Sequence, residues 1–266
     1  AREIYDFVSA EGNVFETLSA QFSWQRVTLN RGLFPTAGSS TVLSFNTTVP
    51  GSDINYYRAN IRQRYYRPLS ANFVFGFQGE LGYLDAYGDT KETPFFQNFY
   101  AGGPRSLRGF ESNTLGPRST DAPCYEFNYA EGTCPNLIDT DGDGVLDQPY
   151  INPYANSTSR YRDRPIGGNI KVEGSLQLIF RLPFIEDQRS MRSAFFFDFG
   201  NVFSDNCKEY QINCSKPSLE ELRYSYGVGI TWITGFGPMS FAIAQPENAG
   251  PRERTEEFQF TVGNVF

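Results

Sequence analysis

The segment Asn169-Ile170-Lys171-Val172-Glu173-Gly174-Ser175-Leu176-Gln177-Leu178-Ile179-Phe180-Arg181-Leu182 alternates between apolar and polar side chains almost without interruption. Successive side chains of a β-strand point to opposite faces, so this period of two predicts a strand with one apolar and one polar face. Strands of soluble domains cluster near ~5–6 residues, and this segment is much longer. Strands of roughly 9–11 residues or more, with an apolar outer face and a polar inner face, are typical of transmembrane β-barrels.

The same alternation recurs along most of the 266 residues. Nine segments are predicted to be strands, namely 15–30, 40–50, 55–68, 72–84, 169–182, 191–203, 223–234, 238–246 and 256–266. Residues 1–14 instead carry apolar side chains at helical spacing and are expected to form a short helix. Aromatic residues make up 16% of the chain, and so many rings need burial or a lipid-facing position. The sequence therefore predicts an all-β chain that forms a transmembrane antiparallel β-barrel.

The connections between the predicted strands alternate in length. The short ones are 30–38, 67–72, 183–190 and 234–237, and the long ones are 85–168, 204–222 and 247–255. Only Pro50-Gly51-Ser52-Asp53 breaks this alternation, because this connection is short where the alternation predicts a long one. Short turns at one membrane surface and long loops at the other are the pattern of outer-membrane barrels. We therefore expect residues 1–14 and the long loop 85–168 to be extracellular, and residues 15–266 to supply the strands.

The number of predicted strands is odd, whereas a single-chain bacterial barrel has an even number and closes on itself. An open edge in lipid would leave unpaired backbone groups, each costing several kcal/mol. The nine segments are therefore expected to be the C-terminal portion of a larger barrel.

The four cysteines fall into two close pairs, Cys124 with Cys134 and Cys207 with Cys214. Both pairs lie among turn-forming residues in the predicted long loops. Four free thiols in a reducing compartment are the alternative, but free cysteines are usually buried. Three pairings are formally open, and adjacency favours two local disulfides in an oxidising space.

Composition excludes several functions. The chain has no histidine, which excludes Ser-His-Asp and Cys-His catalysis and any histidine-ligated zinc site. Its net charge of −7 argues against nucleic acid as a partner, because binding to phosphates needs a basic surface. An outer-membrane hydrolase is disfavoured for the same lack of histidine, and no enzymatic activity is expected.

The segment Asp139-Thr140-Asp141-Gly142-Asp143-Gly144-Val145-Leu146-Asp147 has the spacing of a calcium-binding loop. The expected ligands are Asp139, Asp141, Asp143, Asp147 and the carbonyl oxygen of Val145. Tyr150 stands where an EF-hand has its bidentate glutamate, and a flexible Asp/Gly-rich loop tip is the alternative. Because four carboxylates in one short segment repel each other without a cation, we expect a structural Ca²⁺ with affinity on the order of 10⁻⁴–10⁻³ M.

The long loop begins with Gly102-Gly103-Pro104-Arg105-Ser106-Leu107-Arg108-Gly109-Phe110. Its glycines allow sharp turns while the chain presents basic and aromatic side chains. With the flanking Asn98-Phe99-Tyr100-Ala101 and Ser112-Asn113-Thr114-Leu115-Gly116-Pro117, it resembles the sixth extracellular loop of the BamA family of outer-membrane protein assembly factors. Further segments that resemble this family are 31–38, 50–57, 195–200, 244–246 and 258–266. The resemblance covers about residues 15–266.

The family resemblance implies a sixteen-stranded barrel preceded by periplasmic POTRA domains. It implies that the protein folds and inserts other barrel proteins, without a required cofactor, in the Gram-negative outer membrane. The implied partners are outer-membrane lipids, nascent β-barrel clients and assembly lipoproteins. The last strand would form a weakly paired seam, and its implied residues are Phe258, Phe260, Val262, Gly263 and Phe266.

The resemblance also assigns roles to the loop motif Leu107-Arg108-Gly109-Phe110. In the family the arginine reaches into the barrel lumen, where acidic residues of the wall hold it. Asp198 matches one acidic position, but Gln177 occupies the other, and Glu173 on the same face is expected to substitute for it. Two alternative functions are also compatible with these sequence patterns: a related POTRA-barrel translocase and a passive porin-like channel.

Overall fold

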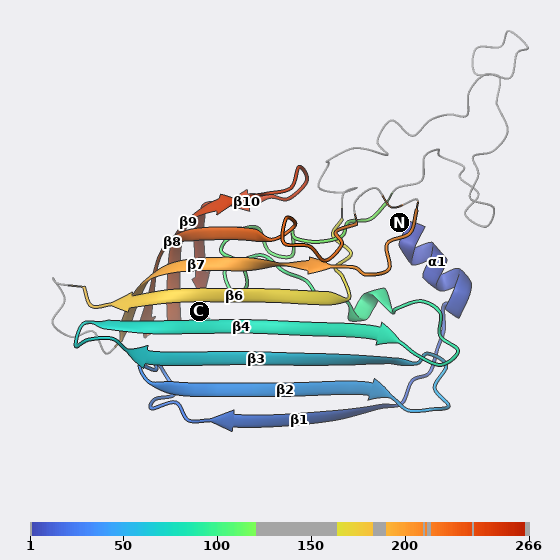
Figure 1. The fold of residues 1–266 in the computed structure, drawn as a ribbon, viewed down its shortest axis with the longest axis horizontal. Coiled ribbons are helices and arrows are strands. Elements are labelled where there is room, and N and C mark those ends of the chain that lie inside the picture. Colours follow the sequence, from blue (N-terminus) through green and yellow to red (C-terminus); the bar gives the residue numbers. More distant parts are fainter. Residues whose placement is uncertain are drawn as a thin grey trace, which may run out of the picture.

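The computed structural model describes residues 2–120, 164–182, 190–209, 211, 214–235 and 237–263. Nine strands form one antiparallel sheet in which neighbours in sequence are neighbours in space (Figure 1). They are β1 (Ser19–Val27), β2 (Gly38–Thr48), β3 (Tyr56–Pro68), β4 (Phe73–Ala86), β6 (Ile170–Phe180), β7 (Met191–Phe203), β8 (Arg223–Thr234), β9 (Gly237–Glu247) and β11 (Phe258–Val262). The sheet curves, so that β8, β9 and β11 turn behind the strands from β1 to β6. Within the described residues the sheet is open, with β1 and β11 at its two edges.

The strands predicted from the period of two are confirmed, with differences at their ends. The first predicted strand, 15–30, is shorter and spans Ser19–Val27. The last, 256–266, is divided into β10 (Thr255–Glu256) and β11. β10 pairs with the two-residue β5 (Gly109–Phe110), which lies in a segment predicted to be loop. A two-residue strand is too short to show any periodicity.

In the described residues, two helices lie outside the sheet. The short helix expected near the start is present as α1 (Arg2–Glu11), and a 3₁₀ turn, η1, spans Phe95–Gln97. None of the helices in the described part of the chain is long and apolar enough to span a bilayer.

The two faces of the sheet differ as the alternation predicts. On the outer face, Leu176 and Phe195 are 38% and 54% exposed. On the inner face, Phe196, Gln177 and Asp198 are buried. Around β6 and β7 the outer surface is therefore apolar and available to lipid, whereas the inner surface is covered by other parts of the chain.

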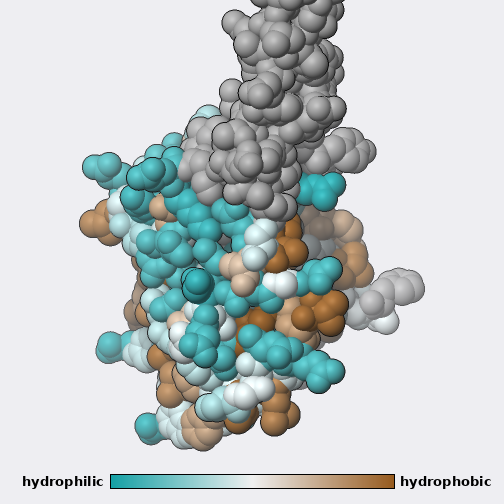
Figure 2. Space-filling view, turned by 90° about the vertical axis from the view of Figure 1, so that its right-hand side faces the viewer, coloured by the Kyte–Doolittle hydropathy of each residue, from teal (hydrophilic) through white to brown (hydrophobic). Residues whose placement is uncertain are grey.

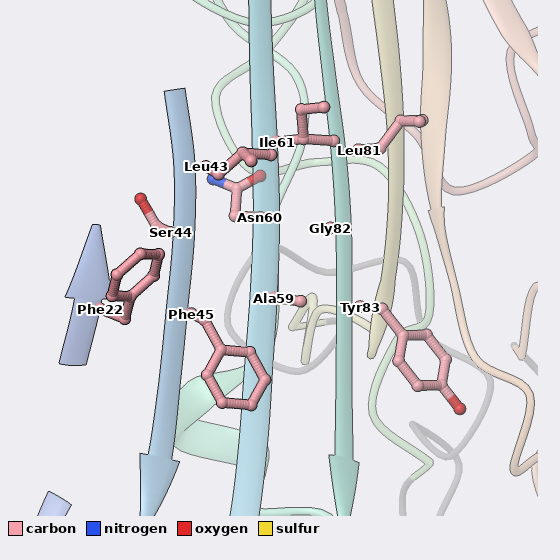
Figure 3. A pocket seen from close by; sticks show the side chains of 10 residues that line it. All are labelled: Phe22, Leu43, Ser44, Phe45, Ala59, Asn60, Ile61, Leu81, Gly82 and Tyr83. Atoms are coloured by element: carbon pink, nitrogen blue, oxygen red, sulfur yellow. The ribbon is translucent and has the colours of Figure 1, made fainter. Parts of the chain in front are cut away.

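The outer face also carries a shallow apolar groove of about 480 Å³ over β1 to β4 (Figure 3). Its centre is Ala59, which is paired in register with Phe45 on one side and Tyr83 on the other. The larger neighbours Phe22 and Ile61 border the same hollow. The groove exists because a small residue stands in a row of large ones.

The hydrophobic core lies on the inner face, towards the end of the sheet that carries the long loops. It consists of Phe7, Ile54, Tyr56, Leu84, Phe99, Ala101, Leu107, Phe110, Leu115 and Val202. Thus α1, the strand ends and the long loop share one core. The ring of Phe99 lies against Gly82 of β4, where a Cβ atom would stand 2.5 Å from Phe99 Cζ.

Polar contacts hold α1 at the end of the sheet that carries the long loops. The surface of the molecule at this end is largely hydrophilic (Figure 2). Lys208 Nζ pairs with Asp6 Oδ2 at 3.4 Å and with Glu92 Oε1 at 2.8 Å. The predicted disulfide between Cys207 and Cys214 is confirmed and lies beside Lys208. The predicted Cys124–Cys134 disulfide, the calcium loop 139–147 and Phe266 lie outside the described residues.

Candidate functional site

The loop motif lies inside the curve of the sheet and is almost completely buried. The side chains of Leu107 and Phe110 are 0% exposed and belong to the hydrophobic core. Gly109 has a φ of +87°, a conformation that favours glycine. A Cβ atom there would also stand 3.1 Å from Ala244 Cβ, so glycine lets the backbone lie against β9. The motif is thus packed onto the barrel wall.

Arg108 and Asp198 form the central polar contact of the site. Arg108 Nε donates to Asp198 Oδ2 at 2.7 Å, and Nη2 donates to Oδ1 at 2.8 Å. The Arg108 backbone N–H donates to the same carboxylate at 3.2 Å. Asp198 is completely buried, so its charge must be paired. The guanidinium also lies 3.5 Å from the ring centre of Phe196, in cation–π geometry.

Gln177 joins this contact through an intermediate hydroxyl group. Arg108 Nη2 donates to Ser175 Oγ at 3.1 Å, and Gln177 Nε2 donates to the same oxygen at 3.2 Å. Arg192 Nη2 in turn donates to Gln177 Oε1 at 3.5 Å. The amide at this position therefore belongs to a hydrogen-bonded network around Arg108 without adding a charge.

Glu173 holds the loop at a different residue from the one expected. It pairs with Lys171 at 3.0 Å and accepts a hydrogen bond from the Ser106 hydroxyl group. The register explains the shift, because Ser175 lies opposite Asp198 and Glu173 lies opposite Gly200, one repeat nearer the loop end. The expectation that Glu173 substitutes as the partner of Arg108 is therefore corrected to a contact with Ser106, two residues earlier in the loop.

Lys171 extends this second attachment across the sheet. It lies 3.5 Å from Glu80 Oε2 on β4, and Glu80 pairs with Arg62 of β3 at 3.2 Å. The loop is thus attached to the inner face of the sheet at two places. Arg108 binds Asp198, and Ser106 binds Glu173, which begins a row of residues of alternating charge.

Sequence reasoning missed three further contacts of the motif. Ser225 Oγ on β8 donates to the Arg108 carbonyl oxygen at 2.5 Å. The backbone of β10 pairs with Gly109 and Phe110. Gln259 on β11 binds the motif with its side-chain amide. The alternation places Ser225 and Gln259 on the inner face, but it does not distinguish the inward polar residues that contact the motif from those that do not.

The terminal strand presents the expected apolar side chains outward. Phe258, Phe260 and Val262 are 58%, 46% and 52% exposed. The ring of Phe260 lies 4.8 Å from that of Phe241 on β9. Gly263 follows the strand with a φ of +85°.

Comparison with known proteins gives concordant results. Residues 2–266 match the Omp85 superfamily domain. The chain is 32% identical over 261 residues to the outer membrane protein assembly factor BamA of Neisseria meningitidis, which covers 91% of this chain. It is 26% identical to the mouse sorting and assembly machinery component 50 homolog, over 70% of this chain. It spans 28% and 31% of the lengths of these two relatives.

The fold is similar to that of a solved structure. The crystal structure of BamA from Haemophilus ducreyi lacking POTRA domains 1–3 superimposes with a TM-score of 0.74 at 30% sequence identity. The match covers 98% of this chain and 47% of that one.

Proposed function

Because the chain belongs to the Omp85 superfamily, we propose that the protein folds other β-barrel proteins and inserts them into the Gram-negative outer membrane. The chain supplies strands of an outer-membrane β-barrel. The observation that carries the proposal is the 32% identity to an assembly factor across 91% of the chain. The function needs no enzymatic chemistry, because inserting a strand exchanges backbone hydrogen bonds and breaks no covalent bond.

The pairing of the strands supports this proposal. Within the part of the chain that the structure describes, five residue pairs join β11 to β9, whereas eleven join β8 to β9. A short edge strand with few partners is the part of a sheet that opens most easily. Once open, such an edge presents unpaired backbone N–H and C=O groups that can pair with an incoming strand. Nascent barrel proteins are therefore the proposed clients.

Lipids are the second proposed partner. The outer face carries exposed Phe, Leu and Trp side chains along the whole sheet, among them Trp24, Phe195 and Trp232. The apolar groove around Ala59 continues this surface and is suited to the hydrocarbon chain of a lipid (Figure 3). Assembly lipoproteins are proposed by similarity to the family.

Replacement of Arg108 in the complete protein tests the function. The gene carrying Arg108→Ala, as the sole copy in the cell, should reduce the amount of folded client barrels, measured by heat-modifiable migration in gels. The purified variant in lipid vesicles should assemble a client more slowly than wild type. Arg64→Ala is the matched control, because this arginine is exposed on β3 and does not belong to the two attachments of the loop described above. Wild-type growth and client levels with Arg108→Ala would contradict the proposed role of the motif.

A passive channel is the main competing function, and a superfamily translocase is another. An open porin would give a large, constant conductance in a planar bilayer. The buried motif and its core fill space inside the curve of the sheet, so we expect the complete protein to conduct little in its resting state. A translocase would secrete its own substrate without raising the level of folded barrels, so the client assay separates the two.

A further inference from the structure

Gln259 connects the last strand of the sheet to the loop motif. Its side chain is 1% exposed and points to the inner face of β11. The amide Nε2 donates to the Phe110 carbonyl oxygen at 2.7 Å, and Oε1 accepts from the Gly109 N–H at 3.4 Å. One side chain thus holds two consecutive residues of the motif.

This contact needs the chemistry of an amide. The motif offers one donor at Gly109 and one acceptor at Phe110, and among side chains of this length only glutamine supplies both a carbonyl oxygen and an NH₂ group. Nε2 also lies 3.3 Å from Glu256 Oε2, which orients the amide group. Because the site is buried, a side chain without these groups would leave the motif's backbone unsatisfied.

The backbone around Gln259 holds the same two residues. In the β5–β10 ladder, Glu256 is opposite Gly109 and Thr255 is opposite Phe110. The Glu111 N–H also donates to the Arg254 carbonyl oxygen at 2.9 Å. The segment 254–259 therefore binds the motif through its backbone at one end and through Gln259 at the other, and the same segment leads directly into β11.

We propose that Gln259 is a positioning residue that couples the loop motif to β11. While β11 lies on β9, the amide holds Gly109 and Phe110 in place. When β11 leaves β9, both hydrogen bonds are lost and the motif is loosened, although Asp198 on β7 still holds Arg108. The coupling itself is inferred from these contacts alone. Its role, which is to change the conformation of the loop when the seam formed by β11 opens, rests on the proposed function.

Hydrogen–deuterium exchange of the complete protein in lipid nanodiscs tests the first half of the proposal. Gln259→Met keeps the side-chain volume and removes both hydrogen bonds, so peptides covering residues 102–112 should exchange about tenfold faster. Gln245→Met on β9 is the matched control, because that glutamine is exposed, and it should leave these peptides unchanged. Gln259→Asn, which retains a shorter amide, should fold and give an intermediate rate. Unchanged exchange in Gln259→Met would show that the side chain only fills space and would overturn the proposal.

A strand lock tests the coupling itself. Phe258 and Ile243 are paired in register and both are exposed on the outer face, so Phe258→Cys with Ile243→Cys can join β11 to β9 by a disulfide. Closing the lock should slow exchange in the motif when Gln259 is present and slow it less when residue 259 is methionine, because only the β5–β10 pairing then remains. An equal effect in both backgrounds, or no effect in either, would overturn the coupling. Because exchange is measured without any client, failure here is distinct from failure in the assembly assay.

Discussion

The guanidinium of Arg108 and the carboxylate of Asp198 face each other in a bidentate ion pair, 90 residues apart in the chain and almost completely removed from solvent. Such a pair adds little net stability compared with well-packed apolar residues, but removing one partner leaves a buried charge alone. The pair therefore specifies where the loop lies more than it stabilises the sheet.

Arg108→Ala is expected to lower the free energy of unfolding by about 3–5 kcal/mol, because Asp198 remains buried without its partner. Urea unfolding of the complete protein in detergent, followed by tryptophan fluorescence, measures this change. The double variant Arg108→Leu with Asp198→Leu should lose less than either single variant. If the double variant loses as much as the sum of the two single variants, the buried-pair explanation is wrong.

Gly82→Val is expected to destabilise the protein by about 1–3 kcal/mol. A Cβ at this position meets the ring of Phe99 at 2.5 Å, so the ring must leave the core it shares with Leu107 and Phe110. Thermal unfolding measures the loss. Gly32→Val is the control, since a Cβ atom at Gly32 would point into open space. Equal effects of the two substitutions would show that the Phe99 contact has no importance.

Replacement of Cys207 and Cys214 by serine is expected to loosen α1. The disulfide closes a short loop with a sequence separation of 7, worth roughly 2–3 kcal/mol by chain entropy, and it constrains Lys208, which pairs with Asp6 of α1. Hydrogen exchange in residues 2–11 should increase, and Lys208→Met should reproduce the effect with the disulfide intact. Lys216→Met removes an exposed charge from the same loop and should change nothing. Protection of α1 that persists in both test variants would refute this link.

Leu176→Arg tests the assignment of the outer face. Arginine at the lipid-facing centre of a barrel strand costs about 2–4 kcal/mol, and the cost should appear in lipid vesicles as a lower folded fraction at equilibrium in urea. Ser44→Arg, on the inner face of β2, should cost much less. If Ser44→Arg costs more stability than Leu176→Arg, the assignment of the outer and inner faces of the sheet is wrong.

Calcium binding at the loop 139–147 remains a prediction from the sequence. Calorimetric titration of the complete protein with CaCl₂ should show binding in the range of roughly 10⁻⁴–10⁻³ M. The variant Asp139→Asn with Asp141→Asn should lose this heat. Absence of heat in the wild type at millimolar calcium would end the hypothesis.

Much of the fold followed from local patterns. Side-chain alternation depends only on the geometry of one strand, so the segment 169–182 revealed its two faces before any partner was known. The pair Cys207 and Cys214 was predictable because the two residues are close in sequence.

The residues that contact the motif could not be predicted from local patterns in the same way. By itself, the sequence determined which residues of each strand face inward and that a glycine-rich loop bearing Arg105 and Arg108 follows β4. Only the tertiary structure decided that Glu173 binds Ser106 and that Ser225 and Gln259 hold the motif. Every inward polar residue satisfies the same period of two, and Gln259 and Phe110 are separated by 149 residues. Which of these equivalent positions meets the loop depends on the register and curvature of the whole sheet, and no local stretch of sequence contains either.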